Sequence, residues 1–236
     1  MMMGIKRAVR KLFCLCGLDI RRFRPYQDYE WMAAANIRTI LDIGANTGQF
    51  ALMGHRLLPN AKLYSFEPLK DCYEQLKRNM EGVPQFLALN YALGDANGRV
   101  EMYRNAFSPS SSILPMGGLH TQAFPLTAVA EPEEIEIRRL DDVATGLDLA
   151  ADVLIKIDVQ GYEDKVILGG QRVISNAAVL IVETSCRPLY QGQALFDTIY
   201  DLLWPMGFAF TGCGEILKDP RDKTILQWDS IFMKKA

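Results

Sequence analysis

"LDIGANTGQF", residues 41–50, is the stretch of sequence that decides the fold. The β-branched run that leads into it predicts a buried strand over residues 39–45, and the segment 47–58 predicts a helix that follows at once. Gly44 and Gly48 let the backbone turn sharply and approach a ligand closely. The N-terminus of the following helix offers free N–H groups. A strand, a glycine loop and a helix in this order predict a ligand-binding loop.

The rest of the sequence alternates between strand-like and helix-like segments. Apolar or alternating runs predict strands over residues 61–68, 98–105, 134–140, 152–161, 177–185, 208–212 and 224–235, and a strand with its exit over residues 84–94. Amphipathic segments predict helices over residues 69–80, 162–174 and 194–207. Residues 106–134 are rich in Ser, Pro and Gly, which predicts a long loop. The alternation predicts an α/β fold with a doubly wound, mostly parallel sheet.

Length and composition suit one globular domain. The chain has 236 residues, of which 49% are hydrophobic, and we expect a domain over residues 37–236 preceded by an arm and a lead-in helix over residues 1–36. The net charge of −2 gives no reason to expect nucleic acid as a partner. Five cysteines without a Cys-x-x-Cys pair predict free thiols in a reducing cytoplasm. The apolar run 12–18 is far shorter than the ~20 residues that span a bilayer.

The N-terminal arm differs in charge from the rest of the chain. Residues 1–24 hold seven Lys and Arg residues and one Asp, a net charge of +6, which leaves −8 for the remainder because the total is −2. Residues 5–16 predict a basic amphipathic helix. Four roles remain open for it: peripheral contact with an anionic membrane surface, a cover over an acceptor site, a contact between subunits of a homo-oligomer, or a solvated helix without such a role. Residues 24–34 predict the lead-in helix.

Acidic residues follow four of the predicted strands: Asp42, Glu67, Asp158 and Glu183. In a doubly wound sheet, ligands bind at the carboxyl ends of the strands. Glu67 comes 23 residues after Gly44, where a carboxylate can accept hydrogen bonds from both hydroxyls of a ribose. Asn46 stands where a dinucleotide fingerprint needs its middle glycine beside the pyrophosphate. A nucleoside with a short, charged tail that lacks phosphate, such as S-adenosylmethionine, fits this pattern.

The segment "IKIDVQGYE", residues 155–163, places a lysine inside an apolar strand. Lys156 and Asp158 point to the same face of that strand, because side chains alternate along it. A buried ammonium group is costly unless it is paired. We therefore expect an ion pair of Lys156 with Asp158 or, on the neighbouring strand, with Asp42.

Taken together, several motifs resemble one known family. They are D-x-G-A-N-x-G (42–48), F-E-P (66–68), N-x-A-L-G (90–94), S-P-S-S-S (108–112), I-K-I-D-V-x-G-x-E (155–163) and V-E (182–183). In this order they resemble the FkbM family of methyltransferases. The resemblance implies a class I, Rossmann-like fold with a seven-stranded, mostly parallel sheet and an antiparallel edge strand. It also implies S-adenosylmethionine as the cofactor. The family usually has Glu where this chain has Gln160.

The resemblance also implies roles for individual residues. The methionine part of the cofactor is expected along Asp42, Gly44, Ala45, Asn46 and Gly48. The ribose is expected at Glu67 and Pro68, and the adenine at Asn90, Tyr91 and Ala92. Asp158 is expected beside the reacting methyl group.

The predicted reaction is O-methylation of a small-molecule or glycan acceptor, on a hydroxyl of a sugar, glycolipid or related metabolite. Asp158 and Glu183 are candidates for the general base, with Lys156 as their ion partner, or for two ligands of a Mg²⁺ ion. His120, in the long loop, is a second candidate base, and Ser110–Ser112 either line the pocket or cap a turn. The alternatives are an NAD-type oxidoreductase and a noncatalytic nucleotide-binding accessory protein.

Overall fold

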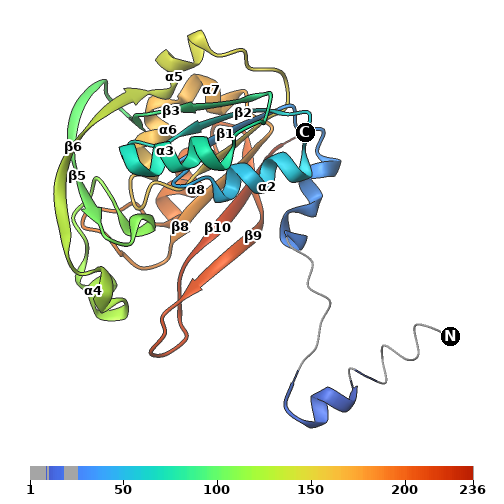
Figure 1. Ribbon diagram of the computed structural model, residues 1–236, viewed down its shortest axis with the longest axis vertical. Helices are drawn as coiled ribbons and strands as arrows, with labels where there is room; N and C mark the ends of the chain where they lie inside the picture. Colours follow the sequence, from blue (N-terminus) through green and yellow to red (C-terminus); the bar gives the residue numbers. More distant parts are fainter. Residues whose placement is uncertain (1–8, 10, 19–25, 236) are drawn as a thin grey trace.

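The computed structural model describes residues 9, 11–18 and 26–235 (Figure 1). Most of the predicted basic arm therefore lies outside the described residues, and its proposed contacts with a membrane or a second subunit stay predictions. The lead-in segment is a 3-10 helix, η1 (Gln27–Ala34), and not an α-helix. No helix among the described residues is long and apolar enough to cross a membrane.

The core of the protein is the predicted seven-stranded sheet. Its strands lie in the order β3 (Phe86–Leu89), β2 (Lys62–Phe66), β1 (Thr39–Ile43), β7 (Val153–Ile157), β8 (Val179–Ser185), β10 (Ile225–Lys234) and β9 (Phe208–Lys218). The first five are parallel, whereas β10 pairs antiparallel with both β8 and β9. The chain order reverses between β1 and β7. At such a switch point the loops that follow the two strands diverge and leave a crevice for a ligand.

Helices cover both faces of this sheet (Figure 1). On one face lie η1, α2 (Gln49–Leu57) and α3 (Lys70–Asn79), and on the other lie α5 (Leu140–Val143), α6 (Glu163–Gly169), α7 (Gln171–Ser175) and α8 (Phe196–Leu203). The strands supply both cores because neighbouring side chains point to opposite faces. In β1, for example, Ile40 packs with the first group and Leu41 with the second. Strands buried on both faces explain the nearly continuous apolar runs of the sequence.

The segment 84–94, predicted as a strand and its exit, contains β3 and then a break in the chain at Asn90. The Asn90 amide donates to the carbonyl oxygens of Glu67 and Pro68, both at 2.9 Å. Beyond this turn, β4 (Ala92–Gly94) leaves the main sheet. It joins β6 (Ala130–Arg139) and β5 (Gly98–Asn105) in a separate three-stranded sheet.

The predicted long loop over residues 106–134 is wrong, since most of it is structured. It contains the 3-10 helices η2 (Ser108–Ser110) and η3 (Pro125–Thr127), the α-helix α4 (Gly118–Ala123) and the start of β6. Two isolated β-bridges, Tyr103 with Ser112 and Met116 with Tyr190, tie the segment to the rest of the domain. A last 3-10 helix, η4 (Ala144–Gly146), follows α5.

Gly44 lets the loops after β1 and β7 pack together. Its φ angle is +83°, and a Cβ atom at this position would lie 1.8 Å from the carbonyl oxygen of Asp158. The backbone N–H of Asp158 in turn donates to the carbonyl of Ile43, at 3.0 Å. Only glycine combines this left-handed conformation with so close an approach.

We predict that Gly44→Ala destabilises the protein far more than Gly82→Ala. Gly82 has nearly the same φ angle, +82°, but a Cβ there would meet nothing within 4 Å. The control should therefore cost only the left-handed strain of about 1–2 kcal/mol. Gly44→Ala should cost more than about 4 kcal/mol, because the clash is with backbone. Thermal or denaturant unfolding measures both, and equal losses would contradict the steric explanation.

Candidate active site

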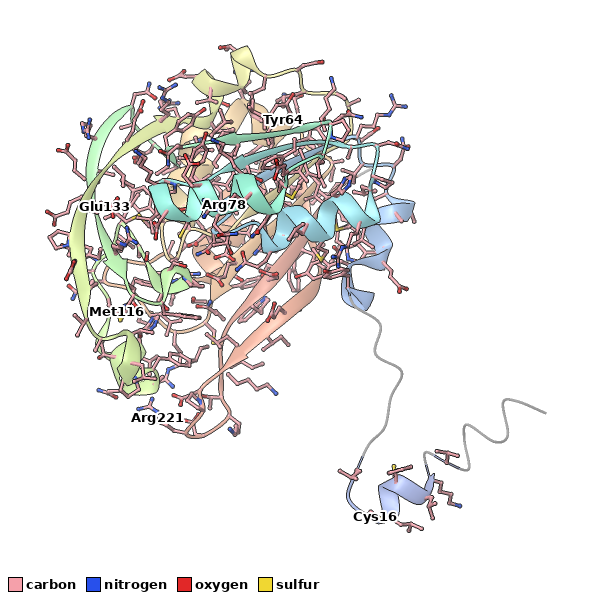
Figure 2. All side chains as sticks on the ribbon, in the orientation of Figure 1. Cys16, Tyr64, Arg78, Met116, Glu133 and Arg221 are labelled. Atoms are coloured by element: carbon pink, nitrogen blue, oxygen red, sulfur yellow. The ribbon has the colours of Figure 1, made fainter. Side chains whose placement is uncertain are left out.

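A cavity of about 680 Å³ opens at the carboxyl ends of β1, β2, β7 and β8. Residues 107–127 and the β9–β10 hairpin form its outer walls. Outside the lining residues, Arg221 of the hairpin turn donates to Gln122 of α4 at 3.4 Å, and Figure 2 shows Arg221 at the edge of the molecule. The volume lies within the range of sites for small molecules and cofactors.

Most of the predicted site residues line this cavity: Asp42, Gly44, Ala45, Asn46, Glu67, Pro68, Ala92, His120, Lys156, Asp158 and Glu183. Three others have structural roles outside its lining. A Cβ on Gly48 would lie 2.7 Å from the Leu76 side chain, so this glycine lets α3 pack closely. Asn90 fastens the turn described above. Tyr91 is buried against Phe66, at 5.9 Å between ring centroids.

The loops after β1 and β2 are fastened to each other. Asn46 has a left-handed φ angle of 47°, a conformation that Asn tolerates better than most residues. Its backbone N–H donates to Glu67 Oε2 at 2.8 Å, and its side chain bonds to Ser108 Oγ at 3.1 Å. Glu67 Oε1 accepts from the N–H of Leu69 at 2.8 Å. Both loops thus have a fixed shape in the cavity wall.

Two of the acids in this wall are almost fully buried. Burial raises the pKa of Asp42 to about 7, against the opposing attraction of Lys156. Asp42 Oδ2 accepts a hydrogen bond from Ser65 Oγ at 3.2 Å. Burial also raises the pKa of Glu67 to about 7, although the N–H groups of Leu69 and Asn46 favour its charged form. A donor or a positive charge brought by a ligand would stabilise both carboxylates.

Lys156 is buried and forms the predicted ion pair with Asp158, at 3.2 Å from Nζ to Oδ2. Its shorter contact, 2.6 Å, is with Asp229 on β10, whereas no hydrogen bond joins it to Asp42. Burial works against the charge, but Asp158 and Asp229 hold the pKa of Lys156 well above its ordinary value. Lys156 is therefore a fixed ammonium group and not a base.

Asp158 and Glu183 are joined by the amide of Gln160. Its Nε2 donates to Asp158 Oδ1 and to Glu183 Oε2, both at 2.8 Å, and its Oε1 accepts from the hydroxyl of Tyr190 at 2.8 Å. Although burial opposes it, Lys156 and then Gln160 hold the pKa of Asp158 below its usual value. Burial and the neighbouring Asp158 raise the pKa of Glu183 well above its usual value. The pKa values of the two acids are therefore shifted in opposite directions.

The predicted Mg²⁺ site does not fit this arrangement. Each of the four oxygens of Asp158 and Glu183 already accepts a hydrogen bond from Lys156, Gln160 or Gln227, and the positive charge of Lys156, 3.2 Å from Asp158 Oδ2, would repel a metal cation. Magnesium requires oxygen ligands in an octahedral set. Among the described residues, no group of three or more His, Cys, Asp or Glu side chains is placed to hold a metal ion.

His120 is not a solvated loop residue. It lies in α4, is only 5% exposed and lines the cavity. Its ring makes edge contacts with Phe124 and Tyr190, at 5.4 and 5.3 Å between centroids. Burial lowers the pKa of His120 below 6.5, so the ring is neutral at neutral pH.

Part of the serine-rich segment lines the cavity, and two of its hydroxyls make hydrogen bonds to other segments. Ser110 and Ser111 line the cavity. Ser111 Oγ accepts from the N–H of Asn105 at 2.9 Å, and Ser112 Oγ donates to the carbonyl of Gln160 at 2.6 Å. The segment is therefore bonded directly to the residue that joins the two carboxylates.

Comparison with known proteins agrees with this geometry. The model of the methyltransferase FkbM domain matches residues 42–210. The chain belongs to the FkbM methyltransferase family. This FkbM protein is thus an S-adenosylmethionine-dependent methyltransferase with the predicted Rossmann-like fold.

Three relatives show the range of this FkbM protein's similarity. It is 31% identical to the 2-O-methyltransferase NoeI of Sinorhizobium fredii over 170 residues, 70% of each chain. It is 29% identical to the methyltransferase sdnD of Sordaria araneosa, over 55% of this chain and 59% of sdnD. It is 24% identical to the hexuronic acid methyltransferase AglP of Haloferax volcanii, over 60% of this chain and 54% of AglP.

Two residues of the FkbM site were missed from the sequence. Asp229 and Gln227 lie on β10 and bond to Lys156 and Glu183. In the sequence, both are polar residues inside the apolar run 224–235. That pattern indicates a site only when it is known that β10 pairs with β8. In that pairing Asp229 lies opposite Glu183.

Glu163, the first residue of α6, binds the backbone of the loop after β7. Its buried carboxyl group makes the stability of the protein depend on pH. Its Oε1 accepts from the N–H groups of Val159 and Gly161, at 3.1 and 3.0 Å. Burial raises the pKa of Glu163 to about 7 from an ordinary value of 4.5. Between these pH values the folded chain keeps a proton that the unfolded chain has lost. The contribution of Glu163 to the free energy of unfolding is therefore fully present below about pH 4.5, and it is lost as the pH rises through about 7.

We predict that Glu163→Gln removes this decline, because Gln can accept the same bonds and does not ionise. From pH 5 to pH 8 the variant should gain up to roughly 3 kcal/mol relative to the parent protein. Urea unfolding across that range measures the difference, and Glu81→Gln, at an exposed position, is the control. Parallel stability curves for Glu163→Gln and the parent would show that Glu163 is ionised in the folded state.

Proposed function

We propose that this protein methylates a hydroxyl group of a sugar, glycolipid or related metabolite, with the Asp158–Glu183 pair as the proton acceptor. The observation that carries the proposal is this pair itself. It lies in the cavity wall next to the glycine loop, bridged by Gln160 and charge-balanced by Lys156. The names of two relatives support this proposal: one is a 2-O-methyltransferase, which supports an oxygen acceptor, and the other is a hexuronic acid methyltransferase, which supports a sugar-like one.

The residues of the inner cavity fit S-adenosylmethionine. Asp42 and the loop Gly44–Asn46 would lie along the amino-acid part of the cofactor. Each Glu67 oxygen accepts one backbone N–H and keeps a second lone pair, so the carboxylate can also accept the ribose hydroxyls. Pro68 and Ala92 would border the ribose and the adenine. The buried acids favour a ligand whose tail carries a positive charge.

When bound, S-adenosylmethionine supplies a methyl group on a positively charged sulfur. The acceptor hydroxyl must lose its proton as its oxygen takes that methyl group. Asp158 stays ionised, because Lys156 and Gln160 hold its pKa low, and each of its oxygens keeps a free lone pair for that proton. Lys156 keeps its charge throughout and stabilises whichever carboxylate is ionised. The apolar part of the cavity wall, which includes Phe107, Phe124 and Ile113, limits the water beside the acceptor.

The two alternative functions, an NAD-type oxidoreductase and a noncatalytic accessory protein, can be distinguished from a methyltransferase. An NAD-type oxidoreductase needs a glycine where Asn46 bonds to Ser108, and an accessory protein needs no buried carboxylate pair. Thermal stabilisation by S-adenosylhomocysteine, compared with stabilisation by NAD, separates the first from a methyltransferase. Mass spectrometry of cell extract incubated with enzyme and labelled cofactor detects the methylated acceptor and separates the second.

We predict that Glu67→Ala weakens the binding of S-adenosylhomocysteine by about tenfold or more, because charge-assisted hydrogen bonds to the ribose are lost. Calorimetry measures the affinity. The control is an analogue that lacks the 2′- and 3′-hydroxyls. This analogue should bind the parent protein and the variant with equal affinity. If the variant weakens both ligands equally, Glu67 acts on the shape of the loop and does not hold the ribose.

We predict that Asp158→Asn folds normally, binds S-adenosylhomocysteine within a few-fold, and transfers methyl groups about 10²–10⁴ times more slowly. Asn keeps hydrogen bonds but cannot accept the proton. Glu183→Gln should show a similar or smaller loss. Product formation in extract with labelled cofactor measures the rates. Because the donor arrangement does not fit Mg²⁺, EDTA should leave the parent rate unchanged. A rate for Asp158→Asn near that of the parent would remove Asp158 as the base.

A further inference from the structure

The outer half of the cavity contains two polar side chains that nothing described so far explains. They are His120 in α4 and Gln227 in β10, both more than nine-tenths buried and both in the cavity lining. His120 Nδ1 and Gln227 Oε1 lack a hydrogen-bond partner among the described residues. Buried polar atoms in native proteins are nearly always paired, so each such exception calls for an explanation.

Gln227 lies directly beside the catalytic pair. Its Nε2 donates to Glu183 Oε1 at 2.5 Å, and it shares the sheet face of Asp229, two residues along β10. Whichever way the amide is turned, one end bonds to Glu183 and the other has no partner. A ligand group bound to the free end of the amide would be separated from the carboxyl group of Glu183 only by the Gln227 amide.

His120 flanks the same pair through a different route. Its ring packs against Tyr190, whose hydroxyl bonds to Gln160, the residue that joins Asp158 to Glu183. Tyr190 and Phe124 hold the ring through edge contacts, and its Nδ1 has no hydrogen-bond partner within the described part of the chain. His120 is therefore held in position by packing and leaves Nδ1 for a ligand.

Apolar side chains complete this half of the cavity. Phe107, Ile113, Phe124, Ile216 and Leu217 line it. A ligand that matches such a wall has one apolar face and an edge of hydroxyl groups, which both donate and accept hydrogen bonds. A hydroxylated ring has this chemistry.

We infer that Gln227 and His120 form the acceptor subsite and bind hydroxyl groups that neighbour the one to be methylated. This inference rests on the proposed function and narrows it to acceptors with at least two adjacent hydroxyls on a ring. Gln227 binds the hydroxyl next to the reacting oxygen, because it contacts Glu183 directly. His120, which reaches the pair through Tyr190 and Gln160, binds a more distant one. Phe124 and its apolar neighbours contact the ring face.

The test uses simple probes in place of the natural acceptor. They are cyclohexanol, 1,2-cyclohexanediol and a methyl hexopyranoside, each offered to the protein saturated with S-adenosylhomocysteine. Saturation-transfer NMR titrations give the three affinities. The parent protein should bind the diol more tightly than cyclohexanol by about three- to tenfold, the worth of one hydrogen bond. The hexoside should gain a similar factor over the diol.

The variants separate the two residues. Gln227→Leu should abolish the preference for the diol over cyclohexanol, and His120→Phe should abolish only the further preference for the hexoside. Both variants should keep the affinity for S-adenosylhomocysteine and for cyclohexanol, which shows that the site is intact. Gln191→Leu, at an exposed glutamine outside the cavity, is the matched control and should behave like the parent.

Two outcomes would overturn the inference. In the first, the parent protein shows no preference among the probes. In the second, both variants keep the preferences of the parent, and the free polar atoms then bind only water. The proposed function is tested separately, by labelling of cell extract with the parent enzyme. Successful labelling without a probe preference would remove the subsite and leave the methyltransferase reaction in place.

Discussion

The site depends on one buried charge. The ammonium group of Lys156 lies in the middle of an apolar sheet, where it is stable only because Asp158 and Asp229 contact it. The ion pairs of Lys156 link β7 to β10, which lie on either side of β8. They also hold the Asp158 side chain in place at the end of β7. The charge of Lys156 also lowers the pKa of Asp158, whereas burial raises the pKa of Glu183. Removing the lysine would leave two uncompensated carboxylates, so the charge distribution of the whole site follows from it.

Gln160 connects the carboxylates at the strand ends to residues outside the sheet. In a left-handed conformation, with φ of 56°, its side chain reaches both carboxylates and the hydroxyl of Tyr190. Its carbonyl accepts from Ser112, so the segment that covers the cavity is bonded to the same residue. A neutral amide suits this place, since it donates to two acids and adds no third negative charge. The carboxylates and the segment that covers the cavity are thus bonded to the same residue, Gln160.

The parts of the protein that follow local rules could be predicted from the sequence. The strand and glycine loop over residues 39–48 depend on apolar periodicity and on backbone conformations that few residues adopt, and both are readable locally. The break at Asn90 and the ordered segment 106–134 could not be predicted, because each depends on contacts with distant residues. Asp229 and Gln227 were missed for a related reason. Their importance comes from the antiparallel pairing of β10 with β8, and a run of residues does not reveal its partner.

The interactions that hold the outer walls of the cavity differ from those that hold its inner part, the floor. Arg221 and Gln122 join the hairpin to α4 through one hydrogen bond, which is long at 3.4 Å and exposed to water. Such a bond contributes little stability. The floor is fixed by buried charges, whereas α4 and the start of β10 share a buried apolar cluster that includes Ala123 and Leu226. Water can therefore replace the Arg221–Gln122 bond at little cost, while the apolar cluster keeps the two walls together.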